Sequence, residues 1–525
     1  MSRRAGAWLA VLALSVPFAS ACRQPPAAEP GTRRLLREEL ENKVRGGWAG
    51  QMIGVSFGAP TEFSSQGRII EGPLPAWRPE KVSNAIDQDD LYVEMTFVGV
   101  MDRKGLDAAS ADFGDAFRTS KYNLWHANAA ARRLLQAGVV PPDSGRPQYN
   151  AHANDIDFQI ESDFIGLMTP GLPRAARGFC ERVGSVMNSG DGLYGGVFIT
   201  SMYSAAFFET DPVRVVEAGL AALPRGSGYA AVIRDVLAWH KANPGDWRQA
   251  WQRILDTWDR NDACPDGALR PFNIDARLNG AYVALGLLYG NGDFGNTIEI
   301  ATRAGQDSDC NPSSAAGILG VIIGYDRIAD EWKRGIPAIA SRRFRFTSYS
   351  LNDIVMSTTR RAEAVIERAG GRVEGDVLVV PEQTAVPPAL EQWDMGVADR
   401  IVPADDPAWQ WRGGWKPLSS PRDKTVKPGR TTRAARASAT LTFTGTALTI
   451  LGEFSERGGA ATMTLDDERV RPMDTWTPPR TTDTGLWHIY GLRPGRHVLK
   501  IETTGTSRSG ERDAEVSILA AVVFR

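Results

Sequence analysis

The stretch Gly305–Gly320, with the sequence GQDSDCNPSSAAGILG, constrains the fold of this chain more than any other. It places two carboxylates, Asp307 and Asp309, just before Asn311-Pro312 and a run of small and apolar residues. Proline is favoured at the first position of a helix, so we expect an acidic loop that leads into a closely packed helix. Carboxylates at a buried helix are costly unless a cation binds there, and oxygen ligands suit Mg²⁺, Mn²⁺ or Ca²⁺.

A second segment repeats this pattern. Asp87, Gln88, Asp89 and Asp90 precede the apolar run LYVEMTFVGVMD, which predicts another buried helix. Either cluster alone is explained by the preference of aspartate for the first turn of a helix. Two such clusters, each before an unusually apolar helix, favour a shared metal site.

The N-terminus has the pattern of an export signal. Two arginines precede the apolar run AGAWLAVLALSVPFA, and residues 19–22 (ASAC) fit both a signal-peptidase site and a bacterial lipobox in which Cys22 is lipidated. We expect a signal peptide over residues 1–21, a tether over 22–32, and an exported lipoprotein of the periplasm or cell envelope, otherwise a secreted protein. The apolar run is short for a membrane span, so we expect membrane contact only through the lipid anchor.

The remaining chain divides into two domains by the period of its apolar residues. Residues 33–371 carry helical spacing in one segment after another, whereas residues 372–525 alternate with period two between turn signals. We therefore predict an all-α domain followed by an all-β sandwich of jelly-roll-like type. The formal net charge of −2 gives no support for nucleic-acid binding.

Three kinds of residue leave alternatives open. The cysteines at 180, 264 and 310 fit no zinc pattern, and one disulfide of unknown pairing is possible. The tryptophans at 393, 409, 411 and 415 suit either sugar stacking or core packing. The polar segment 141–171 either lines a site or merely crosses between helices, and its His152 is better explained as a structural hydrogen-bonding group than as a base.

Four motifs, in this order, resemble the ADP-ribosylglycohydrolase family, that is, the dinitrogenase-reductase-activating glycohydrolase and its relatives. They are Gly50–Gly54 with Glu62, Gln88–Leu91, Asn188–Gly192 and Gly305–Cys310. The chain departs from the family pattern at Gln51, where an aspartate is usual, and at several motif threonines, two of which are Ser308 and Cys310 here. The resemblance covers roughly residues 36–335 and implies an orthogonal helical fold with a pair of Mg²⁺ ions.

The resemblance also implies roles for individual residues. It implies one or two Mg²⁺ ions, with Mn²⁺ or Ca²⁺ as alternatives, and Glu62 as a switchable ligand or general base. The implied metal ligands are Glu62, Gln88, Asp89, Asp90, Asp307 and Asp309, and the catalytic residues are Glu62 and Asp90. The residues expected to orient the sugar or the leaving group are Asn154, Asp155, Asp157, Asp191 and Tyr194.

These expectations combine into a functional hypothesis. An exported chain with this resemblance is expected to be a metal-dependent glycosidase that cleaves an N- or O-glycosidic bond of a riboside or another furanoside. Its substrate would be a small molecule or glycan that contains a furanose. The alternatives are an ADP-ribosyl-protein hydrolase proper and a catalytically inactive glycan-binding lipoprotein.

Overall fold

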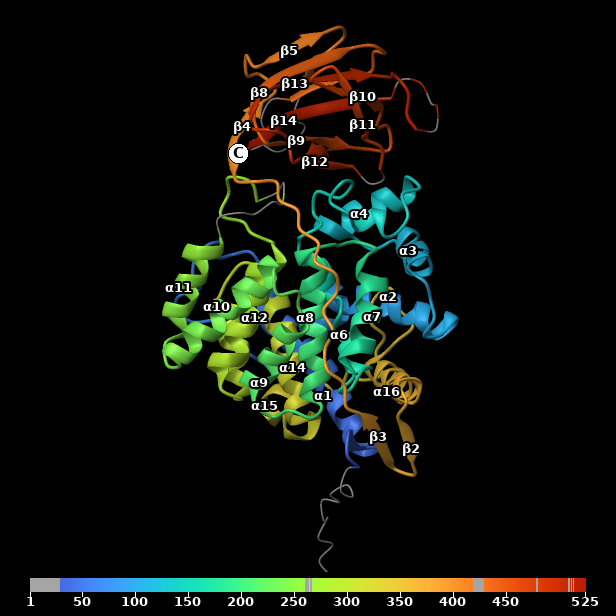
Figure 1. The fold of residues 1–525 in the computed structure, drawn as a ribbon, viewed down its shortest axis with the longest axis vertical. Helices are drawn as coiled ribbons and strands as arrows, with labels where there is room; N and C mark the ends of the chain where they lie inside the picture. Colours follow the sequence, from blue (N-terminus) through green and yellow to red (C-terminus); the bar gives the residue numbers. More distant parts are fainter. Residues whose placement is uncertain are drawn as a thin grey trace, which may run out of the picture.

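The computed structural model describes residues 29–259, 264, 267–418, 429–477, 480–508, 510, 512 and 514–525. A helical domain forms one body, and a β domain sits at one end of it (Figure 1). The predicted signal peptide, Cys22 and most of the predicted tether lie outside the described residues. None of the helices in the described ranges is long and apolar enough to cross a membrane.

The helical domain is built from helices that follow one another along the chain. Its longer helices are α1 (Arg37–Gly58), α2 (Asp89–Lys104), α3 (Ser110–Arg118), α4 (His126–Gln136), α7 (Pro173–Gly184), α8 (Asp191–Ala206), α9 (Pro212–Ala221), α10 (Gly228–Ala242), α11 (Trp247–Trp258), α12 (Ala276–Gly290), α13 (Phe294–Arg303), α14 (Cys310–Ile323) and α16 (Leu351–Arg368). Short helices α5 (Asp157–Ile160), α6 (Asp163–Leu167) and α15 (Asp330–Lys333) lie between them, with 3-10 turns at Ala59–Thr61, Pro79–Asp87, Asp143–Gly145 and Tyr325–Arg327.

The antiparallel helices α1 and α14 pack closely against each other because glycines line their contact. A Cβ atom at Gly50 would lie 2.2 Å from the carbonyl oxygen of Ala316, and one at Gly54 would lie 2.1 Å from that of Pro312. The closely packed helix expected after the acidic loop is therefore confirmed, although it begins at Cys310 rather than at Pro312. This packing holds the start of α14 against the end of α1.

The N-terminal end of the helical domain corrects two local expectations. Residues 33–36 belong to strand β1 (Thr32–Leu36) rather than to a helix, and α1 begins after them. Residues 372–381, which the alternating pattern assigned to the sandwich, form β2 (Arg372–Glu374) and β3 (Val377–Pro381) in a sheet of order β1-β3-β2. Leu35 and Leu378 from this sheet pack into the same core as the helices. The short strands therefore close one end of the helical domain.

The β domain is a sandwich of two antiparallel sheets, as the sequence predicts. Its strands are β4 (Ala398–Pro403), β5 (Trp409–Arg412), β6 (Lys416–Leu418), β7 (Gly429–Thr432), β8 (Ser438–Gly445), β9 (Ala447–Phe454), β10 (Ala460–Leu465), β11 (Glu468–Asp474), β12 (Thr481–Ile489), β13 (Gly495–Thr503) and β14 (Val516–Phe524). One sheet has the order β11-β10-β13-β8-β5 and the other β12-β9-β14-β7-β6, with β4 also paired to β14. Residues such as Leu441, Ile450 and Ile501 from both sheets share one apolar core.

The linker from residue 382 to 397 runs along the helical domain from β3 to the sandwich (Figure 1). Near its end, the indole nitrogen of Trp393 donates a hydrogen bond of 2.9 Å to Asn154 Oδ1. The sandwich itself meets the helical domain where His488 Nε2 contacts the carbonyl oxygen of Pro147 and where Ala268 packs against the outer face of β14. Two loops of the helical domain are thus held by the sandwich.

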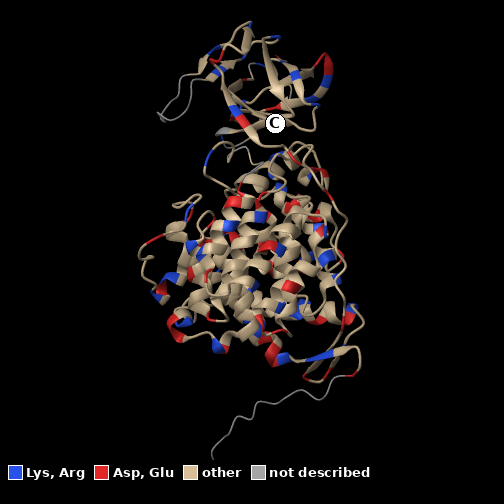
Figure 2. Ribbon diagram, turned by 60° about the vertical axis from the view of Figure 1, so that its left-hand side comes forward, with Lys and Arg blue, Asp and Glu red and all other residues tan. Residues whose placement is uncertain are grey.

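The tryptophans of the linker and sandwich pack against neighbouring side chains. Trp409 and Trp415 are buried in the sandwich core, and the rings of Trp409 and Trp411 stack at 5.0 Å. Core packing, one of the two alternatives that the sequence left open, therefore accounts for Trp409 and Trp415. Figure 2 shows Lys and Arg residues interspersed with Asp and Glu residues over the described ribbon.

Candidate active site

The helical domain contains a cavity of about 710 Å³ on which the predicted acidic segments converge. Its volume lies within the range of small-molecule sites. Its lining comes from the loop after α1, the start of α2, the start of α4, the loop around 156–160 and the loop around 270–274, and from Asp307 and Cys310. The pocket therefore forms where several helices and loops that are far apart in sequence end together.

Two loops that approach each other bring Glu62 next to the acidic loop before α14. The backbone N–H of Phe63 donates to the carbonyl oxygen of Gln306 at 3.1 Å, and the N–H of Gln306 donates to that of Ser65 at 3.0 Å. Phe63 and Gln306 both have positive φ angles, 48° and 55°. Such conformations are disfavoured for side-chain-bearing residues and cluster at functional sites. The paired loops fix Glu62 relative to Asp307 and Asp309.

The start of α2 supplies the second acidic group. Gln88 occupies the N-cap position, and Asp89 and Asp90 form the first turn. Burial and then the charge of Asp309 raise the pKa of Asp89 to about 6, and the pKa of Asp90 lies well above its usual range for the same reasons. The thiol of Cys310 donates to Asp90 Oδ2 at 3.3 Å, which ties α2 to α14.

The buried carboxylates match the requirements of a divalent cation. One oxygen atom on each of Asp90, Asp307 and Asp309 is buried and accepts no hydrogen bond from any residue that the structure describes. Burial, followed by the charge of Asp309, holds the pKa of Asp307 well above normal, and burial raises that of Asp309 as well. Clustered carboxylate oxygens that accept no hydrogen bond are unfavourable as ionised groups, and they suit a hard cation as ligands. These residues therefore fit the expected metal.

Gln88 and Glu62 stand at the edges of this cluster. The Gln88 amide donates to Asn84 Oδ1 at 2.7 Å, and Gln88 also lines the pocket. Glu62 lies at the mouth of the pocket and is exposed, yet it is close enough to the other acids for their charges to shift its pKa. Partial burial, then the charges of Asp309 and Asp89, raise the pKa of Glu62 to about 7. A carboxylate of this kind holds or releases a proton near neutral pH.

Of the five residues predicted to bind the substrate, only Asp157 is among those that line the pocket. Asp157 lines the pocket, but its carboxylate accepts hydrogen bonds from the N–H groups of Ala127 and Asn128 at the start of α4, at 3.1 and 2.9 Å. Asp157 therefore positions α4 from the floor of the pocket.

The other four residues in that set are not among those that line the pocket. Asn154 accepts the hydrogen bond from Trp393, and the Tyr194 hydroxyl donates to the carbonyl oxygen of Ala389 in the linker at 2.7 Å. Asp191 accepts a hydrogen bond of 3.0 Å from the N–H of Tyr229 at the start of α10. Asp155 accepts from the His152 ring at 2.8 Å, beside the pocket wall.

Three acids that the sequence did not assign to the site extend the cluster into the core, two of them from the polar segment 141–171. Glu94, Glu161 and Asp163 are buried, and burial holds the pKa of each carboxyl well above its usual range. Glu94 Oε2 accepts from the N–H of Phe164 at 2.9 Å, and Asn128 donates to Glu161. Glu94 stands four residues after Asp90 on α2, and this spacing on one helix face was the signal that could have identified it.

Aromatic side chains form the remaining wall and the rim. Tyr92, Trp125 and Phe272 line the pocket together with His126, whose ring lies 5.5 Å from that of Phe272. Trp125 is 52% exposed, which is unusual for a side chain of its size. An exposed aromatic ring at the rim of an acidic pocket offers a surface on which a flat group of a ligand can stack.

Comparison with known proteins adds an independent line of evidence. The family model described as ADP-ribosylglycohydrolase matches residues 36–364. No curated protein matches the chain. Among solved structures, an ADP-ribosylglycohydrolase-related protein complex is similar at 16% identity, with 62% of this chain and 99% of that chain covered and a TM-score of 0.39.

Two further solved structures match smaller shares of the chain. A family two carbohydrate esterase from Cellvibrio japonicus is similar at 13% identity over 24% of this chain and 32% of that chain, with a TM-score of 0.16. A family 35 carbohydrate binding module from an environmental isolate is similar at 12% identity over 23% of this chain and 90% of that chain, with a TM-score of 0.17.

Proposed function

This chain belongs to the ADP-ribosylglycohydrolase family, and from that premise we propose that it is an exported glycohydrolase that cleaves an N- or O-glycosidic bond of a riboside or another furanoside. Members of this family are metal-dependent hydrolases. We propose Mg²⁺ as the metal, with Mn²⁺ or Ca²⁺ as alternatives. The export pattern of residues 1–22 supports a substrate outside the inner membrane, in the periplasm or beyond the cell.

One observation carries the proposal. Asp90, Asp307 and Asp309 direct buried carboxylate oxygens, which accept no hydrogen bond from described residues, into one acidic cluster beside a cavity of about 710 Å³. Like charges this close oppose one another strongly unless a cation binds between them or protons neutralise them. A cluster of this kind next to a ligand-sized cavity supports a metal-dependent catalytic site.

Hydrolysis of a ribosyl bond passes through a state in which positive charge spreads over the ring oxygen and the anomeric carbon. A bound divalent cation supplies a fixed anchor for ribose hydroxyls and makes a nearby water easier to deprotonate. With a cation bound, Asp89, Asp90 and Asp307 would be ionised, and their negative charge would favour the developing positive charge. The acidic cluster thus favours a sugar whose hydroxyls face it.

Glu62 is the proposed general base. Its carboxylate stands at the pocket mouth, where water enters, and a pKa raised to about 7 gives it a proton affinity suited to accept a proton from that water. Asp90 is buried and tied to Cys310, so its role is to hold charge and position rather than to exchange protons with solvent. Trp125 and Phe272 are placed to contact the leaving group at the rim.

The departures from the family motifs favour a second candidate, a catalytically inactive protein that binds a glycan. Cys310 stands where the family has a threonine, and its thiol is committed to Asp90. Leu91, which replaces another threonine, is fully buried. Neither side chain supplies a hard oxygen ligand. Cation binding without turnover of any riboside would support this candidate over the hydrolase.

The test is a calorimetric titration of Mg²⁺, Mn²⁺ and Ca²⁺ into the metal-stripped full chain, followed by mass-spectrometric assay on ADP-ribosylated protein, nucleosides and simple furanosides. We expect saturable binding, turnover of at least one furanoside, and loss of both in Asp307→Asn with unchanged helical circular dichroism. The matched control is Asp115→Asn, which removes an exposed carboxylate paired with Arg118 on α3. Full activity in Asp307→Asn would refute the metal-dependent mechanism.

A further inference from the structure

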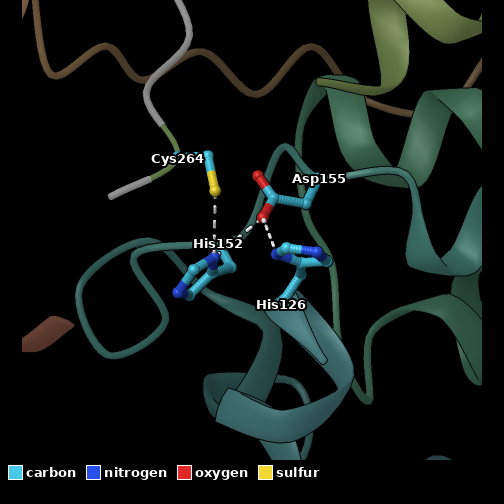
Figure 3. A group of neighbouring side chains, drawn as sticks. All are labelled: His126, His152, Asp155 and Cys264. Atoms are coloured by element: carbon cyan, nitrogen blue, oxygen red, sulfur yellow. Dashed lines mark hydrogen bonds and ion pairs between the residues drawn. The ribbon is translucent and has the colours of Figure 1, made fainter. Parts of the chain in front are cut away.

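A second group of ligand-type side chains lies beside the acidic pocket and plays no part in the mechanism above. It consists of His126 at the start of α4, His152 and Asp155 from the loop before α5, and Cys264 from the segment before α12 (Figure 3). The three side chains other than His126 are buried, and that of His126 is 17% exposed. The four side chains point toward one another (Figure 3).

The distances within this group are those of a preformed ligand set. His152 Nδ1 lies 2.8 Å from Asp155 Oδ2 and 3.5 Å from Cys264 Sγ, and His126 Nδ1 lies 3.9 Å from the same Asp155 oxygen. One ligand atom from each residue lies within 4.8 Å of all the others. Metal–ligand bonds of about 2.0–2.3 Å in a tetrahedron place ligand atoms roughly 3.5 Å apart. Shifts of about 1 Å or less would therefore close the group around an ion.

The chemistry of the donors selects the kind of ion. Two imidazoles, one carboxylate and one thiol offer nitrogen, oxygen and sulfur, a mixture that Mg²⁺ and Ca²⁺ do not favour. Zn²⁺ and related borderline ions accept all three donor types with four ligands in a tetrahedron. Four protein ligands leave no open position, which is the pattern of a structural rather than a catalytic zinc site.

The backbone around the group is held in place independently of any ion. His126 has a φ of 41°, a left-handed conformation at the first residue of a helix that turns its ring toward Asp155. The carbonyl oxygen of Asp155 accepts from the Asn188 side chain at 2.9 Å, and its N–H donates to the carbonyl oxygen of His152 at 2.9 Å. Supporting contacts of this kind orient metal ligands in known sites.

The contacts of Cys264 exclude a catalytic triad as the role of the group. Cys264 shares an apolar cluster with Ile156, Ile274 and Cys310, and its Sγ lies 3.5 Å from His152 Nδ1. A catalytic triad needs its acid and its nucleophile at opposite nitrogens of the histidine. Here Asp155 and Cys264 both approach Nδ1 of His152. The geometry is that of four donors around one point.

We propose that His126, His152, Asp155 and Cys264 form a second metal site, distinct from the acidic cluster, that binds Zn²⁺ or a similar borderline ion. Binding requires the thiolate, so the thiol proton of Cys264 is released to solvent as the Sγ–metal bond forms. The ion joins α4 to the segments before α5 and α12. Since His126 and Ile156 also line the acidic pocket, the second site fixes that wall of the cavity. The proposal does not depend on the hydrolase activity.

The experiment uses Co²⁺ as a spectroscopic substitute for Zn²⁺ in the metal-stripped full chain, with Mg²⁺ in excess to saturate the acidic cluster. We expect one equivalent of Co²⁺ to give an intense thiolate-to-cobalt charge-transfer absorption that Zn²⁺ abolishes and Mg²⁺ does not. Cys264→Ser should lose that absorption and bind Zn²⁺ more than about 100-fold more weakly, because even outer partners of metal ligands contribute 10–100-fold.

Two control variants at other cysteines and one variant of another proposed metal ligand complete the design. Cys180→Ser alters a buried thiol on α7 that contacts Thr200, and Cys310→Ser alters the thiol of the acidic cluster, so both should retain the absorption. If Cys264→Ser does not fold, His126→Gln should keep the thiolate absorption but weaken Zn²⁺ binding at least about tenfold. Absence of the absorption in the unaltered chain, or its loss in Cys310→Ser alone, would overturn the proposal.

Discussion

The glycine contact between α1 and the loop before α14 predicts how finely the metal site depends on helix packing. Gly58 is the last residue of α1, and a Cβ atom there would lie 2.1 Å from the carbonyl oxygen of Ser308 and 2.5 Å from Cα of Asp309. Both neighbours are backbone atoms of the acidic loop, so no side chain can rotate away. Ordinary contact begins at about 3.4 Å, and Gly58→Ala must therefore move the loop by about 1 Å.

A displacement of this size has two measurable consequences. Overpacking of a well-filled interior destabilises a protein by about 1–3 kcal/mol, and we expect the unfolding free energy of Gly58→Ala to fall by that amount. Because Asp309 moves with the loop, we also expect cation affinity to fall by at least about tenfold, since a misplacement of about 1 Å can lower catalytic efficiency roughly 100-fold.

Urea unfolding and calorimetric titration of Mg²⁺ measure the two effects on the same samples. The matched control is Gly178→Ala on α7, where an added Cβ atom meets nothing within 4 Å. Alanine has the higher helix propensity, so this control should gain up to about 1 kcal/mol and bind Mg²⁺ unchanged. Gly58→Ala with normal stability and normal Mg²⁺ affinity would show that the loop tolerates the displacement, and the argument from close packing would be wrong.

Three further predictions concern the chemistry of the pocket. Cys310→Thr should bind Mg²⁺ about tenfold more tightly, because a hydroxyl oxygen is a harder ligand than a thiol, whereas Cys310→Ala, titrated beside it, should show no gain. The pKa of Glu62 is raised from 4.5 to about 7, so ionised Glu62 destabilises the metal-free folded chain as pH rises through this range. The unfolding free energy of Glu62→Gln minus that of the unaltered chain should therefore increase between pH 4.5 and 7 in urea unfolding, and a difference that does not change with pH would contradict the pKa shift. Taking this difference cancels the contribution of other groups, such as His488, whose pKa burial lowers to about 3. Trp125→Ala should raise KM about fivefold and leave kcat nearly unchanged, since stacking contributes about 1 kcal/mol to binding; an equal loss in kcat would place Trp125 in the chemical step instead.

The acidic cluster was largely predictable because its signals are local. Asp89, Asp90, Asp307 and Asp309 each stand at the start of an apolar helix, where charge next to a buried segment is visible in the sequence itself. Glu62 had no such signal. It follows a 3-10 turn in an exposed loop, and only the resemblance of the surrounding motifs identified it.

The residues expected to bind the substrate were predicted much less well. Asn154 and Tyr194 are polar residues among buried helices, as a pocket lining would be, yet they contact the linker that leads to the sandwich. Nothing in their neighbourhood in sequence encodes the path of that linker, which is more than 180 residues further along the chain. Whether a polar side chain faces a ligand or another segment depends on contacts that form only when the domains assemble.

The chain's periodicities and its acidic helix starts were enough to predict a helical domain, a following sandwich and a cluster of buried acids. Helix period, strand alternation and local charge are properties of neighbouring residues. Tertiary packing alone brought His126, His152, Asp155 and Cys264 together from three separate segments and joined β1 to β3 at the far end of the helical domain. The physical reason is that the local pattern of apolar residues determines which side chains are buried. Which distant side chains come into contact depends on how the helices, the loops between them and the sandwich pack together.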